Sequence, residues 1–256
     1  MKISETTTEG LSAPVQGDAR VWPVPQQPVA PWWHTAIVIA VIHGVSALGS
    51  MQAKAITLGQ RHLVHYAITM AWEGALAALV WWGIRMRRVP MRQLLGQRRA
   101  GVEAWLTDFG VALIFWVMAI IVLAAISSVL RLLGLIQAQK AVFALAPRSA
   151  WEAVLWIALS IVAGLVEEVV FRGYLLQQFA SLSGRLWVGV LVSSLLFGAG
   201  HGYEGIGSMI VIVAYGAMFC ALALQRKSLR AGMMAHAWHD SITGIALAIV
   251  QHLHLI

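Results

Sequence analysis

Seven long apolar stretches constrain this chain more than any other feature of its sequence. A helix that crosses the hydrocarbon core of a bilayer needs about 20 mostly apolar residues. The stretches that meet this length are residues 33–53, 62–84, 107–133, 150–178, 186–202, 206–225 and 231–251. Apolar residues make up 59% of the chain and charged residues only 11%, so the chain is more apolar than a typical soluble domain. The sequence therefore predicts an all-α, multi-pass transmembrane helix bundle with about seven spanning helices, or eight with a re-entrant or interfacial segment.

The chain divides into three parts. Residues 1–31 are polar and Pro-rich and lack the apolar core of a cleaved signal peptide, so we expect a disordered tail. Residues 32–106 hold the N-terminal transmembrane helices and a basic loop, in which residues 91–106 have the pattern of an interfacial amphipathic helix. Residues 107–251 form a core in which the unusual polar residues gather.

The net charge of +7 comes mainly from arginines in short loops between apolar stretches. We interpret them as determinants of membrane orientation and not as a nucleic-acid surface. The basic loops follow the second, fourth and sixth stretches, so a seven-helix alternation places them on one side of the membrane. The positive-inside rule makes that side cytoplasmic. We expect an integral protein of a bacterial-type cell membrane with its N-terminus in the cytoplasm.

Several ionisable residues lie inside the predicted spans, where each costs at least about 2.5–3.5 kcal/mol at a helix centre. The acids are Glu73, Glu167, Glu168 and Asp240, and they are accompanied by Arg172, His201, His236 and His239. Such residues need a partner or a function. Glu73 has no obvious partner in the sequence, and we interpret it as a packing or topology feature; we interpret His239 as structural.

The sequence Glu-Glu-Val-Val-Phe-Arg at residues 167–172 combines two acids with one base. On an α-helix Glu168 and Arg172 share a face and can neutralise each other, with the acid in the favourable N-terminal position. Glu167 is turned about 100° away from Glu168, which leaves its carboxylate available as a general base. The alternative is that both glutamates join one ion-pair cluster that holds helices together.

His201 ends the fifth stretch, and His236 and Asp240 lie four residues apart in the seventh. With a turn near residue 182, Glu167 and His201 lie about 22 and 28 Å from that turn along antiparallel helices, so they can share a water molecule. His236 and Asp240 share a helix face and can stabilise developing negative charge or orient a partner. The alternative for them is a local His–Asp hydrogen bond. Residues 202–205 are interpreted as a loop or lip beside His201.

One conflict arises from depth in the membrane. His236 lies only about 9 Å, or six helical residues, from the basic loop at residues 226–230, whereas Glu167 and His201 lie more than twice as deep. A helix must be tilted or broken, a turn must be longer and non-helical, or the seven-span count is wrong. The glycines where such breaks are expected are Gly198, Gly200, Gly202, Gly205, Gly207 and Gly232.

The chain lacks the residue patterns that several classes of intramembrane protease require. The chain has no His-Glu-x-x-His sequence, and Ser160, Ser193 and Ser194 do not stand in a Gly-x-Ser-x context. Asp240 is the only aspartate deep in a predicted span, so a pair of catalytic aspartates is excluded. A water-activating glutamate–histidine site remains. Zinc stays open, because Glu167, His201 and His236 are residue types that bind it.

Three motifs, Glu167-Glu168-x-x-x-Arg172, Phe197-x-x-x-His201 and His236-x-x-x-Asp240, occur in this order on successive predicted helices. Together they resemble the signature of the type II CAAX prenyl protease and bacteriocin-processing family, also called the CPBP or Abi membrane proteases. The resemblance covers residues 107–251 and leaves residues 1–100 outside.

The resemblance implies an all-α membrane bundle and a role for each motif residue. Glu167 and His201 would activate a water that attacks a peptide carbonyl, and His236 with residue 240 would hold the oxyanion. Glu168 and Arg172 would form a supporting ion pair, and no cofactor would be required. Many relatives of the eukaryotic type have Asn where this chain has Asp240. Because an ionised aspartate cannot donate a hydrogen bond, Asp240 must either be protonated or orient His236.

We therefore expect a membrane-embedded endopeptidase. Its partners would be the lipid bilayer and a membrane-associated or lipid-modified peptide or protein substrate, with no nucleic acid. One alternative is a catalytically silent binding, immunity or scaffold protein with the same fold. The other is a small proton-coupled transporter that uses buried Glu and His, although no pair of repeats is recognisable in the sequence.

Overall fold

The computed structural model of the chain describes residues 25, 27–53, 62–96, 100–136 and 140–253. Apart from one isolated β-bridge between Gly96 and Ser228, its regular elements are helical, which confirms the predicted all-α class. The α-helices are α1 (Trp32–Ala53), α2 (Leu63–Met86), α3 (Met91–Leu95), α4 (Val102–Leu132), α5 (Lys140–Leu145), α6 (Ala150–Glu167), α7 (Leu176–Ser183), α8 (Leu186–Gly200), α9 (Ile206–Arg226) and α10 (Arg230–His252). A π-helix, η1 (Glu168–Leu175), joins α6 to α7, and a 3₁₀ turn, η2 (Gly202–Glu204), follows α8.

Each predicted apolar stretch coincides with a helix, and the chain is a multi-pass helical membrane protein. Within the described residues, four helices are long and apolar enough to cross a bilayer: α2, α4, the continuous α6–η1–α7 helix, and α9. Shorter apolar helices occupy Trp32–Leu48 and Leu186–Gly200. The α10 helix, which carries His236 and Asp240, is not among the four. Seven crossings of the membrane therefore stay a prediction.

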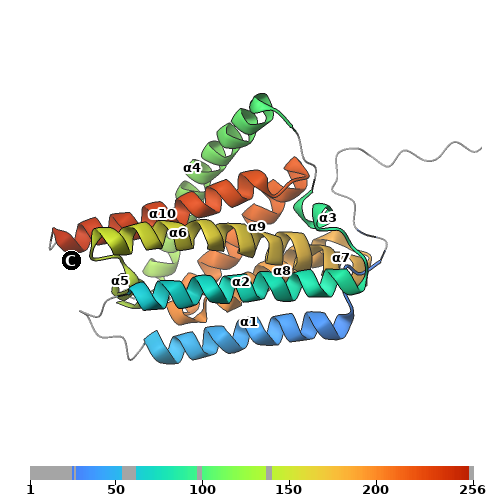
Figure 1. The fold of residues 1–256 in the computed structure, drawn as a ribbon. Helices are drawn as coiled ribbons and strands as arrows, with labels where there is room; N and C mark the ends of the chain where they lie inside the picture. Colours follow the sequence, from blue (N-terminus) through green and yellow to red (C-terminus); the bar gives the residue numbers. More distant parts are fainter. Residues whose placement is uncertain (1–24, 26, 54–61, 97–99, 137–139, 254–256) are drawn as a thin grey trace, which may run out of the picture.

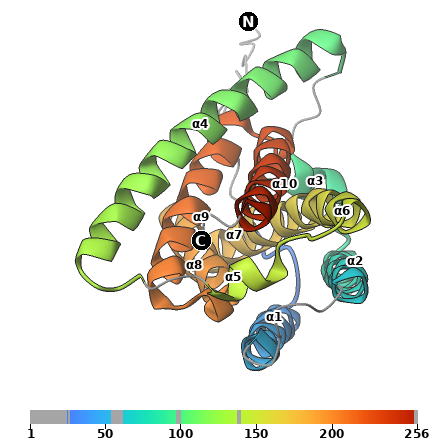
Figure 2. The same cartoon turned by 90° about the vertical axis from the view of Figure 1, so that its left-hand side faces the viewer.

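The α6–η1–α7 helix lies at the centre of the bundle (Figures 1 and 2). It packs on α10 and α2 along α6 and on α8 along α7, and α8 packs in turn on α9. The α4 helix crosses α9 and α10 obliquely on one side of the molecule, and α1 and α2 lie on the other (Figure 2). The central helix carries the first motif, and the helices of the other two motifs, α8 and α10, are its neighbours.

Small residues allow α6 and α10 to approach closely. A Cβ atom added at Gly164 would lie 2.8 Å from the backbone nitrogen of Ala237. Further along, the Trp156 indole packs on Gly244 and donates a hydrogen bond of 2.9 Å to the carbonyl of Asp240. The close approach at Gly164 places the end of α6, where Glu167 lies, beside His236 of α10.

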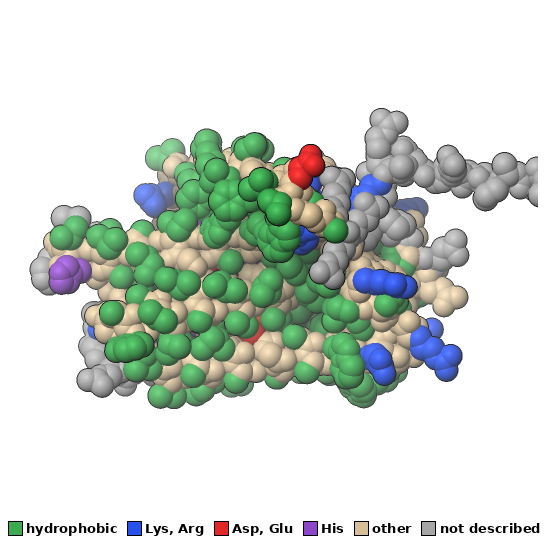
Figure 3. Space-filling view, turned by 45° about the horizontal axis from the view of Figure 1, so that its top comes forward, with side chains coloured by type: hydrophobic (Ala, Val, Ile, Leu, Met, Phe, Trp, Pro, Cys, Tyr) green, Lys and Arg blue, Asp and Glu red, His purple; other side chains and the backbone are tan. Residues whose placement is uncertain are grey.

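The basic loops lie at one end of the bundle, where α2 ends and where the α7–α8 and α9–α10 turns are found (Figure 1). Figure 3 shows a mostly hydrophobic face with Lys and Arg gathered mainly at this end. Arg226 and Arg230 are half-buried and lie 2.6 and 3.3 Å from the Asp108 carboxylate, so they also fasten α9 and α10 to α4. The assignment of this end to the cytoplasm stays a prediction.

Two predictions about the N-terminal half are wrong. Residues 91–106 do not form one interfacial helix, because Gly96 ends α3 at a φ of +81° and α4 begins only at Val102. Leu94 is fully buried and packs beside Gly173 of η1. Residues 97–99 lie outside the described residues.

The predicted tail ends earlier than residue 31. Residues 1–24 and 26 lie outside the described residues, but Val29 and Ala30 are fully buried. The Gln178 side chain binds the backbone of Ala30 through two hydrogen bonds, accepting from its N–H at 3.0 Å and donating to its carbonyl at 2.9 Å. Residues 29 and 30 are therefore part of the core.

The packing of the α9–α10 turn resolves the conflict of depth. Leu229 donates a backbone hydrogen bond of 3.1 Å to the carbonyl of Leu95 and packs beside Gly173 of η1, about ten residues before the end of the central helix at Ser183. The turn at Gly184 between α7 and α8 extends further toward the end of the bundle than this turn does (Figure 1). Because α10 starts at this recessed level, His236 reaches Glu168 after fewer than two helical turns.

Cysteine substitutions at Arg88 and Arg148 should be labelled from opposite sides of the membrane. Both arginines are exposed, Arg88 after α2 at the basic end and Arg148 before α6 at the other. With the basic end inside, an impermeant maleimide should label R148C in intact cells and R88C only in inside-out vesicles. The native Cys220 is buried, so the unmodified chain gives the background. Labelling of both variants from one side would refute this topology.

Candidate active site

The site begins at a change of helix type. Residues 150–178 were predicted as a continuous α-helix, but Glu168–Leu175 is a π-helix. Wider turns of this kind are rare and occur often at functional sites. The Ser193 hydroxyl of α8 donates a hydrogen bond of 2.6 Å to the Phe171 carbonyl inside this segment, which satisfies a backbone group in the altered helix.

Glu168 contacts two basic side chains through one oxygen atom. Its Oε1 lies 3.0 Å from a terminal nitrogen of Arg172 and 3.1 Å from Nδ1 of His236. The Glu168 side chain is only 1% exposed. Because a carboxylate accepts hydrogen bonds, Nδ1 of His236 carries the proton in this contact.

Aromatic rings enclose the Arg172 guanidinium. Its central carbon lies 4.1 Å from the ring centre of Phe197, 4.8 Å from that of Phe219 and 5.9 Å from that of Phe171. Cations over aromatic faces are attracted by the ring quadrupole. Arg172 is thus held in an apolar site by one carboxylate and by the faces of nearby rings.

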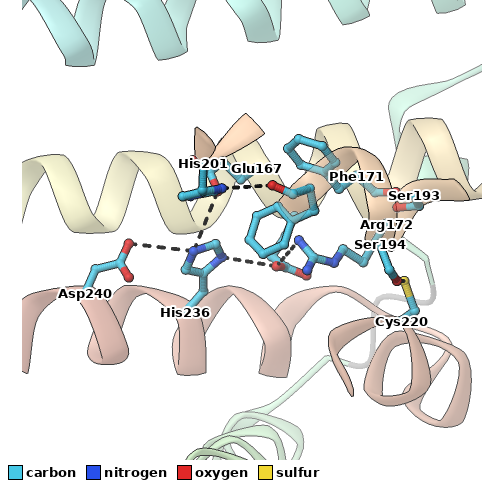
Figure 4. Close-up of polar contacts among 11 residues, drawn as sticks. Glu167, Phe171, Arg172, Ser193, Ser194, His201, Cys220, His236 and Asp240 are labelled. Atoms are coloured by element: carbon cyan, nitrogen blue, oxygen red, sulfur yellow. Dashed lines mark hydrogen bonds and ion pairs between the residues drawn. The ribbon is translucent and has the colours of Figure 1, made fainter. Parts of the chain in front are cut away.

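His236 directs its second ring nitrogen between two carboxylates (Figure 4). Nε2 lies 3.7 Å from Oε2 of Glu167 and 3.6 Å from Oδ2 of Asp240. Both distances fit ion pairs but exceed ordinary hydrogen-bond lengths. The ring is buried and stacks on Phe219 at 5.2 Å.

Glu167 differs from Glu168 in its surroundings. Its side chain is 17% exposed, and among the described residues its Oε2 has no hydrogen-bond partner. Both glutamates approach His236, as the ion-pair alternative required, but only Glu168 forms a hydrogen bond with it. The Glu168 carboxylate is therefore bound to two neighbouring side chains, whereas the Glu167 carboxylate can accept a further hydrogen bond.

His201 ends α8 with a defined ring orientation. Its Nδ1 lies 2.9 Å from the carbonyl oxygen of Phe197. Because a carbonyl only accepts, Nδ1 carries a hydrogen, and Nε2 of the neutral ring offers a lone pair. Figure 4 draws His201 and Glu167 on the same side of the His236 ring.

Two further acids belong to this polar group. Glu204 of η2 is hydrogen-bonded to Tyr203, and burial raises the pKa of its carboxyl group. Glu73 of α2 is buried, and among the described residues its Oε2 has no hydrogen-bond partner. The sequence had marked Glu73 as an acid inside a span but gave no partner for it. His239, by contrast, packs against Tyr215 at 5.0 Å.

Residues 149–242 match the family model described as Type II CAAX prenyl endopeptidase Rce1-like. The matched segment runs from the N-cap of α6 into α10 and contains all three motifs. This part of the chain is an Rce1-like type II CAAX prenyl endopeptidase domain of the CPBP family, which confirms the resemblance. Comparison with curated proteins and with solved structures gave no match.

Among the described residues, no three His, Cys, Asp or Glu side chains are grouped so that they could hold a metal ion. Glu167, His201 and His236, the three that the sequence offered to zinc, are thus not arranged as ligands of one ion. Whether the protein requires a metal stays a prediction, tested with the activity below.

Replacement of Arg172 by Met should destabilise the protein strongly. The free energy of unfolding should fall by about 3–5 kcal/mol, because the change leaves the buried Glu168 carboxylate without its main counter-charge. Titration with SDS in mixed micelles measures this loss, and R185M, at an exposed arginine, is the matched control. The double variant E168L/R172M should recover part of the stability; a double variant less stable than R172M would contradict this account.

Proposed function

We propose that this protein is an intramembrane endopeptidase that hydrolyses a peptide bond through a water molecule activated by Glu167 and His201. The observation that carries the proposal is the Glu167 carboxylate, whose Oε2 lies 3.7 Å from His236 Nε2 and has no hydrogen-bond partner among the described residues. This carboxylate lies in a domain whose family model describes an endopeptidase.

In the proposed reaction, a water molecule donates one hydrogen bond to Glu167 and one to the free Nε2 of His201. Glu167 takes a proton from the water as the oxygen attacks the carbonyl carbon of the peptide. The carbonyl becomes a tetrahedral oxyanion. Glu167 then returns the proton to the amide nitrogen, the C–N bond breaks, and a carboxylic acid and an amine form; the acid gives its proton to the amine as the products leave.

In this proposal His236 carries a proton on each ring nitrogen, and the N–H at Nε2 holds the oxyanion. Glu168 fixes the ring through Nδ1, at 3.1 Å, and so directs Nε2 toward Glu167. A donor held in place before the reaction stabilises charge that develops in the transition state. Arg172 supports the arrangement because it neutralises Glu168 and is itself enclosed by aromatic rings.

Asp240 acts in its protonated form as a second donor. Since Glu168 already orients the His236 ring at Nδ1, that ring does not need Asp240 for its orientation. Asp240 Oδ2 lies 3.6 Å from Nε2, next to the position of the developing charge. This supports the protonated alternative over the orienting one.

The substrate class is a membrane-associated or lipid-modified peptide or protein. Most of the helices beside the site are apolar and long enough for a bilayer, so a soluble substrate would have to approach the membrane to be cleaved. The N-terminus in the cytoplasm of a bacterial-type cell remains part of this proposal.

Substitution of the water-activating residues should abolish cleavage without abolishing binding. In lipid nanodiscs with candidate peptides, E167Q and H201A should each lower kcat by about 10²-fold or more, because each removes a group that activates the water. H239A is the control, and a chelator should leave the wild-type rate unchanged. Cleavage that survives both substitutions would refute the mechanism, and peptide binding without any cleavage would favour a silent binding protein.

Replacement of Asp240 separates its two alternative roles. D240N keeps a hydrogen-bond donor and should retain most of the wild-type kcat. D240A removes the donor and should lower kcat by about 10²-fold. Equal losses in both variants would show that the carboxyl group itself is needed, and the measurement is kcat at saturating peptide.

A further inference from the structure

Two helices at the basic end of the bundle are followed by a basic residue in the left-handed backbone conformation. Arg88 follows α2 at a φ of +56°, and Lys227 follows α9 at a φ of +53°. Among the described residues, these are the two non-glycine residues with a positive φ. Glycine adopts this conformation without strain and is the usual residue after a helix. The helix dipole favours a positive charge at these positions, and a bound anion would favour it further.

The short helix α3 lies between these two residues. It begins three residues after Arg88 and carries Arg92 in its first turn. Gly96, which ends α3, packs so closely on the Lys227 carbonyl that a Cβ atom at this position would not fit. The backbone thus brings Arg88, Arg92 and Lys227 together around one small helix, and we call these three residues the basic platform.

The basic platform has no counter-charge within the parts of the chain that the structure describes. Arg88 and Arg92 are exposed, Lys227 is half-buried, and none of the three has an ion-pair partner there. The buried acid at this end of the bundle, Asp108, is already bound to two other arginines. The positive charge of the platform is therefore available to a ligand from outside the chain.

The platform lies near the surface of the membrane. About one turn before the end of α2, Trp81 and Trp82 are 50% and 46% exposed, and the Arg85 guanidinium lies 5.3 Å from the ring centre of Trp81. Exposed tryptophans are enriched where the acyl chains of a bilayer meet its headgroups. Lipid phosphate groups are therefore within reach of the platform, and lipids with a net negative charge are attracted to it.

The inner side of α3 contacts the central helix beside the proposed active site. Leu94 is fully buried, and a Cβ atom added at Gly173 would lie 3.2 Å from the Leu94 side chain. The Gln177 side chain donates a hydrogen bond of 3.1 Å to the carbonyl of Gln93. Gly173 directly follows Arg172, whose ion pair belongs to the site. A ligand that restrains α3 therefore also restrains the π-helix.

We propose that the basic platform binds the headgroups of anionic phospholipids, and that a lipid bound there raises the rate of the proposed reaction through α3. The binding stands on the platform alone, whereas the effect on rate rests on the proposed function. The arginine guanidinium donates paired hydrogen bonds that match the oxygens of a phosphate group. A zwitterionic headgroup carries its own cation beside the phosphate, so the platform selects anionic headgroups.

Photo-crosslinking tests the lipid site directly. In phosphatidylcholine nanodiscs, a photoactivatable phosphatidylglycerol should label the segment 88–96 of the wild type. Unlabelled phosphatidylglycerol should compete with this labelling, and added inorganic phosphate should not. R88Q and R92Q should each reduce the labelling about fivefold, because each removes one charge at the surface.

The matched control is R185Q, which removes an exposed arginine at the same end of the bundle but outside the platform. It should leave the labelling of the segment 88–96 unchanged. Equal labelling of the wild type, R88Q and R92Q would overturn the lipid site. Competition by inorganic phosphate would show an anion site without selectivity for lipid and would also overturn the proposal.

Kinetics tests the effect on rate. With an uncharged peptide at saturating concentration, the wild-type kcat should be at least about fivefold higher in nanodiscs that contain phosphatidylglycerol than in phosphatidylcholine alone. The double variant R88Q/R92Q should lose this response and keep the lower rate in both lipids, whereas R185Q should respond as the wild type does. A wild-type kcat that does not depend on the lipid, or a response that survives in the double variant, would refute the effect on rate.

The two proposals can fail separately. If the wild type cleaves no peptide in either lipid, the endopeptidase proposal fails, and the labelling still decides whether the platform binds anionic lipid. If cleavage depends on Glu167 but R88Q and R92Q are labelled like the wild type, the lipid proposal fails alone.

Discussion

The contact of one Glu168 oxygen with both Arg172 and His236 organises this part of the molecule. A buried ion pair contributes little net stability, but removal of one partner leaves an uncompensated charge that costs several kcal/mol. The three side chains come from the central helix and from α10, so they fix how these helices face each other. The aromatic rings around Arg172 keep water away from the pair, and the orientation of the His236 ring follows from it.

Close helix packing makes this contact possible. Gly164 allows the backbone of α10 to approach α6, and a Cβ atom at Gly232 would lie 3.1 Å from the Glu168 carboxylate. Small residues at membrane helix interfaces allow such approach where no hydrophobic driving force between helices exists. The polar residues of the site are therefore held by backbone proximity on one side and by aromatic packing on the other.

Helix positions were predictable because a bilayer requires long apolar stretches, and each stretch became a helix within a few residues of the predicted bounds. The motif residues were predictable because ionisable groups inside spans are rare. The π-helix was not, since its residues have no composition that distinguishes them from an α-helix. Glu168 was expected to pair with Arg172 alone, because α-helical geometry gave no information about His236, 68 residues away. The same absence of long-range information left residues 29 and 30 in a tail.

The contact between the α9–α10 turn and the end of α3 fixes the position at which α10 begins, and so the position of His236. Leu229 is hydrogen-bonded to Leu95, and the bridge between Gly96 and Ser228 lies beside it. His236 follows seven residues later on a rigid helix, about 10 Å along its axis. Any displacement of α3 at the surface would therefore be transmitted to the imidazole as a shift of the whole helix. The register of His236 relative to the two glutamates is thus set from outside the three motifs, by the contact of residues 95 and 96 with residues 228 and 229.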